Sequence, residues 1–287
     1  MTEYADNAIV PATPDQLITH DANGWVNSPY KLMEVGAIEL PFGYIDRVGT
    51  LHKVCEVHPM GGEEEDMLTS PRTKRHMLDL LTMCVTKLGP LDAPYEGRTK
   101  EQRVALREAL DSLILEDQTF ILIALRRVSF PDGHIYKFRV TCPNKRCEDR
   151  LHVHALDLRE LVITPAPTPL QRLYEHVLPL SKKTVRFGHA TEGDTKRLND
   201  LVTQSPESAS SIELYARTID VDGAKLASYA DLKKWSSWDR DSLRGAMSVN
   251  RGGIDLRPTL EACPSCGVSV PVTLEPDLSF FRPALVK

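Results

Sequence analysis

Four of the six cysteines fall into two close pairs, and their spacing is typical of a metal site. The stretch CPNKRC contains Cys142 and Cys147, and the stretch CPSCG contains Cys263 and Cys266. Ligand pairs two to four residues apart suit structural zinc, and four thiolates close the tetrahedral shell, so no position remains for water or substrate. We therefore expect these four cysteines to bind one structural zinc ion as a cofactor.

The residues beside the cysteines favour tight turns between strands. Pro143 and Pro264 follow the first cysteine of each pair. Proline fixes the backbone angle of a turn, and the later amides stay free to hydrogen-bond the thiolate sulfur. Gly267 supplies the left-handed position that such a turn often needs. The signal is stronger for CPSCG, because the four intervening residues of CPNKRC are the upper limit of the usual spacing.

Three other interpretations of the cysteines stay open. The pairs could form disulfides or remain free thiols, although a reducing compartment disfavours disulfides. A redox Cys-x-x-Cys is disfavoured because CPSC lies in a predicted strand–turn–strand and not at a helix start. A local site could combine Cys142 and Cys147 with His152 or His154. These histidines alternate on a predicted strand, so at most one of them can face the metal.

A shared ion would connect segments that are far apart in the chain. Between Cys147 and Cys263 lie 115 residues. A cross-link over that span restricts the unfolded chain by roughly 4 to 5 kcal/mol, if metal closure acts as a disulfide does. The zinc ion would thus staple the fold. The other two cysteines, Cys55 and Cys84, lie in apolar patterns and are expected to be buried as small hydrophobic residues.

Composition and charge disfavour several classes of protein. The chain has 287 residues and is 41% hydrophobic, which is enough for a buried core. Its net charge of −5 would repel a phosphate backbone. The opening MTEYADNAIV lacks the basic flank and apolar core of a signal peptide, and no run approaches the roughly 18 apolar residues of a membrane helix. We expect a soluble protein made in the cytoplasm, with no nucleic-acid or membrane partner.

The chain carries none of the common catalytic motifs. It contains no H-E-x-x-H, Gly-rich phosphate loop, G-x-S-x-G or dinucleotide fingerprint. His58 beside the acidic stretch 63–66 is a weak candidate for a metal site, and His76 with Asp79 is a weak candidate for an acid–base pair. Isolated histidines on half-polar elements are seldom catalytic. We therefore predict no enzyme activity, no catalytic residues and no small-molecule substrate.

Hydrophobic periodicity predicts both helices and strands. In the first half we expect a hairpin of strands at 34–40 and 51–58, a helix start at 63–66, helices at 72–88 and 101–113, and a strand at 134–141. The segment 117–128 is expected to be a central buried helix or a strand, and its Leu and Ala content, with Asp117 as a cap, favours the helix. In the second half we expect a strand at 151–156, a hairpin at 174–180 and 184–187, a helix at 191–202, mixed elements at 214–221, 226–235 and 238–249, and strands at 254–262 and 268–274. Trp235 and Trp238, at helical spacing, are expected to pack and not to stack on bases.

These elements predict an α+β fold. Its N-terminal half is helical, and a β-hairpin zinc-knuckle region contains an inserted mixed α/β segment. We divide the chain into an extended N-terminal arm (1–33), a hairpin and helical region (34–141) and the zinc-knuckle region (142–287). The insert spans 148–262, and the zinc-knuckle region is expected to pack as one unit with 34–141.

Several stretches resemble those of a known family. They are LPFGYIDRVGTLHKVCEVHPMGGEEEDML, DQTFILIALRRVSF, CPNKRC, LHVHALDLREL and CPSCGVSVPVTLEPDLSFFRP. From Glu34 to Pro283 the chain resembles the baseplate hub assembly proteins of T-even-type contractile-tailed phages and related prophage tails. In that family an R-x-x-S/T-[YF] helix end precedes the first knuckle, and a Phe-Phe-x-Pro element follows the second. The matching residues here are Arg126, Ser129 and Phe130, then Phe280, Phe281 and Pro283.

The resemblance implies a role in tail assembly, as a baseplate or hub component or as a chaperone that acts while the hub forms. We accordingly expect a non-enzymatic protein whose partners are other baseplate and hub proteins. Its expected location is the host cytoplasm during assembly, with the virion tail baseplate as a second location. The alternative is a zinc-ribbon adaptor for nucleic acid or transcription machinery. Against it, Lys145, Arg146 and Arg150 form only a small basic patch, opposed by Glu148 and Asp149.

The C-terminal FFRP motif suggests a docking element. Phe280 and Phe281 are adjacent, so in an extended tail they point in opposite directions and one surface easily buries only one of them. One expectation is that the other ring docks on a partner, with Pro276 and Pro283 holding the segment extended. The alternative is that both rings fold back onto the zinc knuckle as core.

Overall fold

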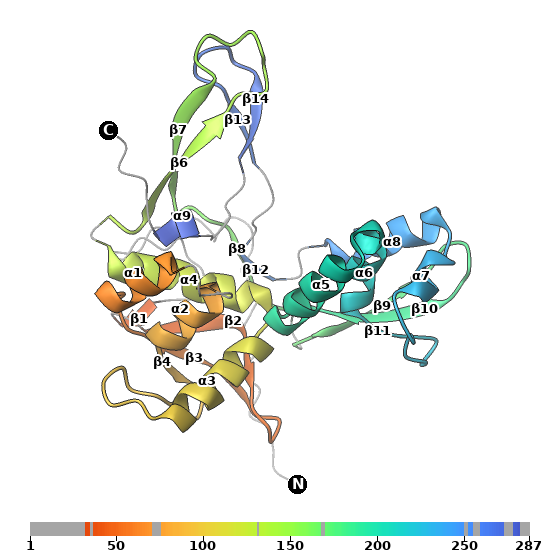
Figure 1. Cartoon of the computed structure of the whole chain (residues 1–287), viewed down its shortest axis with the longest axis horizontal. Coiled ribbons are helices and arrows are strands. Elements are labelled where there is room, and N and C mark those ends of the chain that lie inside the picture. Colours follow the sequence, from red (N-terminus) through yellow and green to blue (C-terminus); the bar gives the residue numbers. More distant parts are fainter. Residues whose placement is uncertain are drawn as a thin grey trace.

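The computed structural model describes residues 32–34, 37–70, 76–130, 132–167, 170–249, 252–254, 259–272 and 278–281. Its helices and strands form three lobes, each with its own cluster of buried apolar side chains (Figure 1). This mixture of helices and strands agrees with the predicted α+β class. The predicted N-terminal arm lies outside the described residues, apart from Leu32 and Met33. No helix of the described residues has the length and apolar character of a membrane span.

The first lobe contains a five-stranded antiparallel sheet with the strands in chain order. The strands are β1 (Leu32–Glu34), β2 (Ala37–Ile45), β3 (Leu51–Val57), β4 (Val85–Leu88) and β5 (Leu91–Asp92). The predicted hairpin is confirmed as β2 and β3. Helices pack around this sheet (Figure 1): α1 (Gly62–Thr69), α2 (His76–Cys84), α3 (Lys100–Ser112) and α4 (Leu115–Ser129).

The predicted helix at 72–88 is too long at its C-terminal end. The described helix α2 ends at Cys84, and the chain continues directly as strand β4, which pairs with β3. Val85 and Leu88 are buried, as a helical pattern requires, but they lie on the strand. The buried positions of a short strand and of a last helical turn coincide here, so periodicity alone does not separate the two.

Helix α4 is the centre of the first lobe. Every residue from Phe120 to Leu125 is buried, as the nearly uniform apolar run predicts. A helix with so small a polar face needs partners on most sides, and α4 contacts β2, β3, α2 and the short strand β12 (Gly253–Ile254). The end of α4 leads into the third lobe, which consists of two hairpins. The first pairs β6 (Ile135–Thr141) with β7 (Leu151–Asp157), and the second pairs β13 (Thr259–Ala262) with β14 (Ser269–Val272).

The expectation that one phenylalanine of FFRP docks on a partner is wrong. Phe280 and Phe281 lie in a short helix, α9 (Leu278–Phe281), and are 0% and 1% exposed. Adjacent side chains of a helix diverge by about 100° instead of pointing in opposite directions, so both rings enter one core. The alternative expectation, that both rings are buried, is right, but they pack in the first-lobe core and not on the cysteine turns.

Arg126 fixes α9 against α4. Its guanidinium donates hydrogen bonds to the carbonyl oxygen of Phe280 and, at 3.1 Å, to that of Ile135. The same group lies 5.0 Å from the centre of the Phe280 ring and 5.2 Å from that of Tyr136. Buried cations are costly unless paired or hydrogen-bonded, and here backbone carbonyls and aromatic faces take that role.

The second lobe has a three-stranded antiparallel sheet in the order β11–β10–β9. Its elements are β9 (Leu173–Val177), β10 (Thr184–Gly188), α5 (Glu192–Gln204), α6 (Ala209–Arg217), β11 (Thr218–Val221), α7 (Ala230–Lys233) and α8 (Ser237–Met247). The hairpin predicted at 174–180 and 184–187 is confirmed. Trp235 packs against this lobe's core as expected, but Trp238, in the first turn of α8, is 70% exposed.

Polar contacts and a short two-stranded neck join the second lobe to the first. The neck pairs β8 (Ile163–Thr164) with β12, and both of its isoleucines lie in the first-lobe core. Beside it, the His189 side chain is only 4% exposed. Its ring nitrogens lie 3.1 Å from a Glu116 carboxylate oxygen and 2.9 Å from the Tyr174 hydroxyl. His189 therefore connects α4 to the sheet of the second lobe.

Asp117 is a fully buried carboxyl at the same junction. Its Oδ1 accepts a hydrogen bond of 2.9 Å from the backbone N–H of Phe42. Arg172 donates to the carbonyl oxygens of Phe42 and Gly43. Burial raises the pKa of Asp117 to about 7, and the Phe42 N–H and the charge of Arg172 oppose this rise only in part.

We predict that Asp117→Asn removes a pH dependence from folding stability. The pKa of Asp117 is raised in the folded chain, so the folded state binds the extra proton between the ordinary carboxyl pKa and about 7. The free energy of unfolding of the wild type should therefore fall by up to about 1.4 kcal/mol per pH unit as the pH rises through that window. Asparagine keeps the acceptor oxygen for Phe42 but cannot ionise.

Urea unfolding of the two proteins at about pH 5 and about pH 8 measures this effect. The variant should gain stability relative to the wild type as the pH rises. Contributions of the cysteine cluster are common to both proteins and cancel in the comparison. An unchanged difference between variant and wild type at the two pH values would contradict a buried carboxyl that holds its proton.

Candidate metal centre

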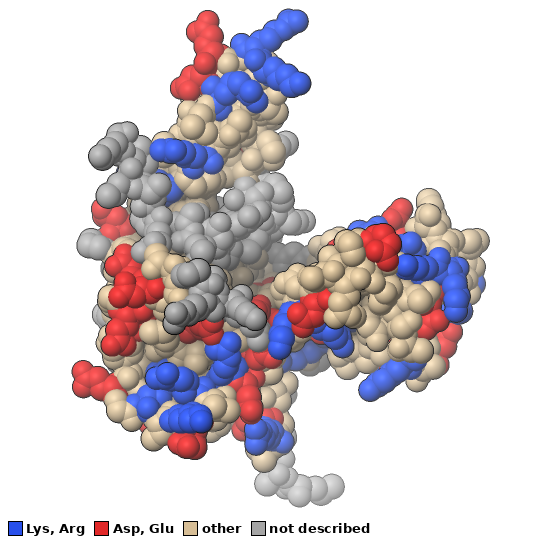
Figure 2. Space-filling view, in the orientation of Figure 1, with Lys and Arg blue, Asp and Glu red and all other residues tan. Residues whose placement is uncertain are grey.

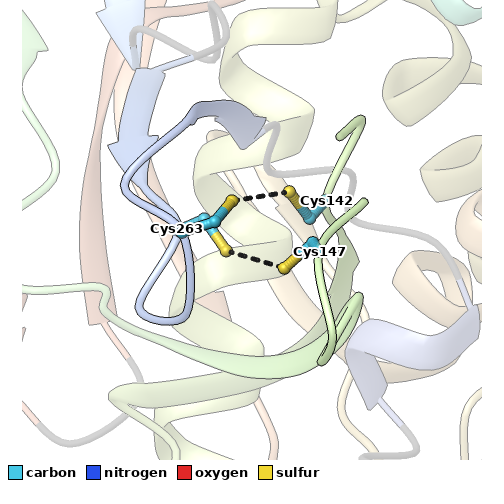
Figure 3. Close-up of side chains that lie close together, drawn as sticks. Cys142, Cys147 and Cys263 are labelled. Carbon is cyan, nitrogen blue, oxygen red and sulfur yellow. Dashed lines mark hydrogen bonds between the residues drawn. The ribbon is translucent and has the colours of Figure 1, made fainter. Parts of the chain in front are cut away.

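Cys142 and Cys147 lie in the turn between two strands of the third lobe, β6 (Ile135–Thr141) and β7 (Leu151–Asp157). The N–H of Cys142 donates to the carbonyl oxygen of Arg150 at 2.7 Å and so extends the strand ladder into the turn. The N–H of Cys147 donates to the carbonyl oxygen of Asn144 at 3.0 Å. The turn therefore folds back and presents both thiols to the second hairpin (Figure 3).

Cys263 and Cys266 lie in the turn between β13 (Thr259–Ala262) and β14 (Ser269–Val272). The N–H of Cys263 donates to the carbonyl oxygen of Val268 at 2.9 Å, and the N–H of Gly267 donates to that of Cys263 at 2.8 Å. Gly267 has a φ of +71°, which confirms the left-handed position that the sequence indicated. The two pairs thus have related turns, each between antiparallel strands.

The structure brings all four predicted ligands together. The sulfurs of Cys142 and Cys266 are 3.6 Å apart, and those of Cys147 and Cys263 are 3.8 Å apart (Figure 3). The four sulfurs all lie within 4.8 Å of one another. Metal–sulfur bonds of about 2.3 Å in a tetrahedron separate neighbouring sulfurs by about 3.8 Å. This cluster therefore has the dimensions of a four-thiolate site and could bind a metal ion.

The other interpretations of the cysteines fit this geometry less well. A disulfide needs sulfurs about 2.05 Å apart, and the described cysteines are all free. The second pair lies between strands, so no helix N-terminus is present to activate a redox thiol. His152 and His154 are not part of the cluster, and the His154 ring instead lies 5.3 Å from that of Phe138.

The four thiols of the cluster differ in burial and therefore in pKa. Cys142, Cys147 and Cys263 are buried beside Val140, Val270 and Val272, whereas Cys266 is exposed. Burial raises the pKa of the Cys147 thiol to about 12 and also raises that of Cys142. The backbone N–H of Val268, followed by the Asn144 side chain, lowers the pKa of Cys266 to about 6. A bound cation would stabilise the thiolate forms of the buried cysteines, so metal binding releases protons.

Most of the residues that were weak candidates for a second metal site or an acid–base pair make structural contacts instead. The His58 ring stacks on Tyr95 with centroids 3.9 Å apart, and its Nδ1 lies 2.7 Å from the carbonyl oxygen of Pro59. Glu64 is buried and accepts a hydrogen bond from the N–H of Gly61, so the acidic stretch begins α1 as expected. Asp79 pairs with Arg107. The side chain of His76 is outside the described residues.

The structure contains a cavity whose lining residues could not be predicted from the sequence. It has a volume of about 420 Å³ and is lined by residues of both the first and second lobes, among them Ile114, Arg172, His189, Arg197 and Arg217. These residues are spread over more than 100 positions and follow no motif. Only the topology, which places the start of α4 beside α5 and β11, brings them together.

Comparisons with protein-family models, with curated proteins and with solved structures found no match to this chain. Functional inference therefore depends on the residues and their geometry. Among the described residues, the four-thiol cluster is the group with metal-ligand geometry.

We predict that Cys263→Ala abolishes metal binding and releases the second hairpin from the first. The free energy of unfolding should fall by roughly 4 kcal/mol, because the variant loses the metal cross-link that closes the long loop between the two hairpins. Cys55→Ala is the matched control: it also removes one buried sulfur, but from the first-lobe core. It should cost about 1 to 2 kcal/mol and leave the metal content unchanged.

Elemental analysis, thermal melting and limited proteolysis measure these effects. In the Cys263→Ala protein, new cleavage should begin near β13 and β14. If this variant retained its metal and resisted protease like the wild type, the two cysteine pairs would not share one ion.

Proposed function

We propose that this chain is a non-catalytic assembly component of a contractile-tail baseplate or hub, held together by a structural zinc ion. The observation that carries the structural half of this proposal is the cluster of four sulfurs within 4.8 Å, contributed by two separate hairpins. Four thiolates fill a tetrahedral shell. An ion held in this way has no open position for substrate and acts as a cross-link.

Zinc is the proposed ion because of the donor set. Tetrahedral sites with four sulfurs hold zinc or iron, and zinc suits a purely structural role because it undergoes no redox change. The valines around the thiols shield three of them from solvent. The backbone N–H of Val268 lowers the pKa of the Cys266 thiol and so favours the thiolate form that binds metal.

We predict about one zinc ion per chain in freshly reduced, purified protein, because four thiolates bind one tetrahedral ion. Elemental analysis distinguishes zinc from iron, and a chelator in mild denaturant should remove the ion and expose the third lobe to protease. Protein without any metal would contradict both the zinc assignment and the cross-link between the hairpins. Protein with iron as its natural ion would contradict the zinc assignment only.

The residues that carry the family resemblance lie close together in the folded chain, which supports the tail-assembly proposal. Arg126 contacts Phe280, the aromatic element after the second knuckle. The hydroxyl of Ser129 accepts a hydrogen bond of 2.9 Å from the N–H of Met60, in the stretch before α1. Three separate motifs therefore converge at the end of α4. Such convergence is expected if the motifs were selected as one structural unit.

The shape of the molecule is also consistent with a connecting role. The three lobes project in different directions from the junction near α4 and β12 (Figure 1). Each lobe therefore offers its own surface. We propose that these surfaces bind other baseplate and hub proteins in the host cytoplasm during tail assembly, and in the baseplate itself if the chain stays in the particle.

The alternative, a zinc-ribbon adaptor for nucleic acid, is favoured by one observation. The third lobe exposes five cations: Lys137, Arg139, Lys145, Arg146 and Arg150. Acidic groups lie beside basic ones at its free end (Figure 2), where Glu148 and Asp149 are exposed. The described side chains of this lobe include no exposed aromatic residue on which a base could stack. We therefore rank this function second.

Deleting the reading frame tests the assembly proposal directly. In the phage or prophage that encodes the chain, we predict tails without complete baseplates, as seen by electron microscopy. Tagged wild-type chain supplied in trans should restore baseplates and co-purify with identified baseplate or hub proteins. Cys55→Ala should restore them as well, whereas Cys263→Ala should not. Complete tails in the absence of the chain would refute the assembly role while leaving the zinc site intact as a finding.

A further inference from the structure

The hairpin of the third lobe has two edges, and the register of its strands shows which backbone groups lie on each. Thr141 pairs with Leu151, and Ile135 pairs with Asp157. Beyond the two ends, the N–H of Cys142 bonds the carbonyl oxygen of Arg150 and the N–H of Leu158 bonds that of His134, each at 2.7 Å. In an antiparallel pair, every second residue turns its N–H and C=O toward the neighbour. The even-numbered residues of β7 therefore face β6.

The odd-numbered residues of β7 turn their backbone groups to the opposite edge. Within the described residues, the N–H and C=O of Leu151, Val153 and Ala155 make no hydrogen bond along this edge. The side chains of Leu151 and Val153 are 53% and 44% exposed. A row of unpaired backbone groups beside exposed apolar side chains is a template for a further strand.

The two edges of the hairpin differ in how they are protected. On β6, the residues whose backbone groups face outward include Lys137 and Arg139, both exposed. Charged residues of this kind are a common device that prevents pairing at an edge. β7 has no charged residue from Leu151 to Leu156, no proline and an unbroken register over its full length. Only the β7 edge is left suitable for pairing.

We propose that the β7 edge is the contact between two copies of this chain, paired antiparallel about a two-fold axis at Val153. Such pairing makes a continuous four-stranded sheet from two hairpins. With the axis at Val153, this residue lies opposite its own copy and Leu151 lies opposite Ala155. Opposite residues point to the same face, so the exposed apolar side chains of one copy cover those of the other.

A second copy fits this edge for three reasons. The sequence LHVHAL presents apolar residues at every outward position, so the strand is complementary to itself. A contact through β6 would instead bring Lys137 and Arg139 of the two copies together. The third lobe extends away from the second (Figure 1), and the exposed side chains of Leu151 and Val153 lie toward the cysteine-turn end of β7. The cysteine turn at the end of the hairpin keeps the edge ordered before contact, which lowers the entropy lost on binding. This inference does not depend on a role in phage tails.

Sedimentation of the full-length, zinc-loaded chain over a range of micromolar concentrations tests the proposal. The wild type should form a dimer, and amide hydrogen exchange at Leu151, Val153 and Ala155 should slow as the dimer forms. Val153→Pro removes an outward N–H without touching the bonds to β6. Val153→Lys places a charge on the edge at an exposed position. Each should raise the dissociation constant by about tenfold or more, because the two-fold axis repeats the loss in both copies.

The matched control is Arg139→Pro. Arg139 is the register partner of Val153, and its N–H lies on the outer edge of β6. This variant makes the same backbone change in the same hairpin and should remain a dimer. Zinc content and melting temperature verify that each variant is folded.

Three outcomes would overturn the proposal. The first is a wild type that is monomeric at all concentrations tested. The second is a dimer that both Val153 variants leave intact. The third is a dimer that Arg139→Pro dissociates as fully as Val153→Pro does.

Discussion

The fold depends on bringing together two turns that are separated by 115 residues of chain. The chain leaves the first lobe at β6, forms the first cysteine turn, passes through the whole second lobe and returns as β13 and β14. Closing so long a loop costs conformational entropy. The β8–β12 neck, whose isoleucines pack in the first-lobe core, offsets part of that cost. An ion bound by the four thiols would offset more of it. The second lobe therefore begins and ends at nearly the same place.

The return of the chain also explains the buried arginine. After β14, the chain reaches α9, which must be joined to a core built mostly from residues before 130. Phe280 and Phe281 provide the buried apolar area. Arg126 fixes the orientation of α9, because its planar guanidinium donates hydrogen bonds to a carbonyl oxygen of α9 and to one of β6. Leucine or methionine at position 126 could fill the space, but neither could hold two carbonyl oxygens. The position therefore favours arginine over an apolar residue.

Local pattern was sufficient for most elements and for the cysteine site. The alternation of β2 and β3, the apolar run of α4 and the cysteine turns with proline and glycine are encoded in neighbouring residues, and the structure agrees with them. Cys142, Cys147, Cys263 and Cys266 were recognisable because thiol pairs at short spacing have few uses. Such a ligand set defines a kind of site and not a biological role.

The wrong expectations share a physical cause, since each concerned which neighbour a segment meets. Val85 and Leu88 belong to a strand because β3 lies beside them. Phe280 and Phe281 are both buried because α9 is helical and Arg126 receives it. Trp238 is exposed although Trp235, three residues earlier, is packed. Likewise, the contact of His189 with Glu116 joins residues 73 positions apart. Local sequence does not contain this information.

The β8–β12 neck has a consequence for how such a chain can change over time. Ile163 and Ile254 are paired in the neck and lie in the first-lobe core. The segment between them therefore leaves the first lobe and returns to it at the same place. Insertions or deletions in that segment, away from Arg172 and His189, would leave the neck and the contacts of those two residues with the first lobe in place. The neck itself tolerates less change, because both isoleucines are buried and Gly253 has a φ of +80° with the Glu116 side chain 2.7 Å from where a Cβ would lie.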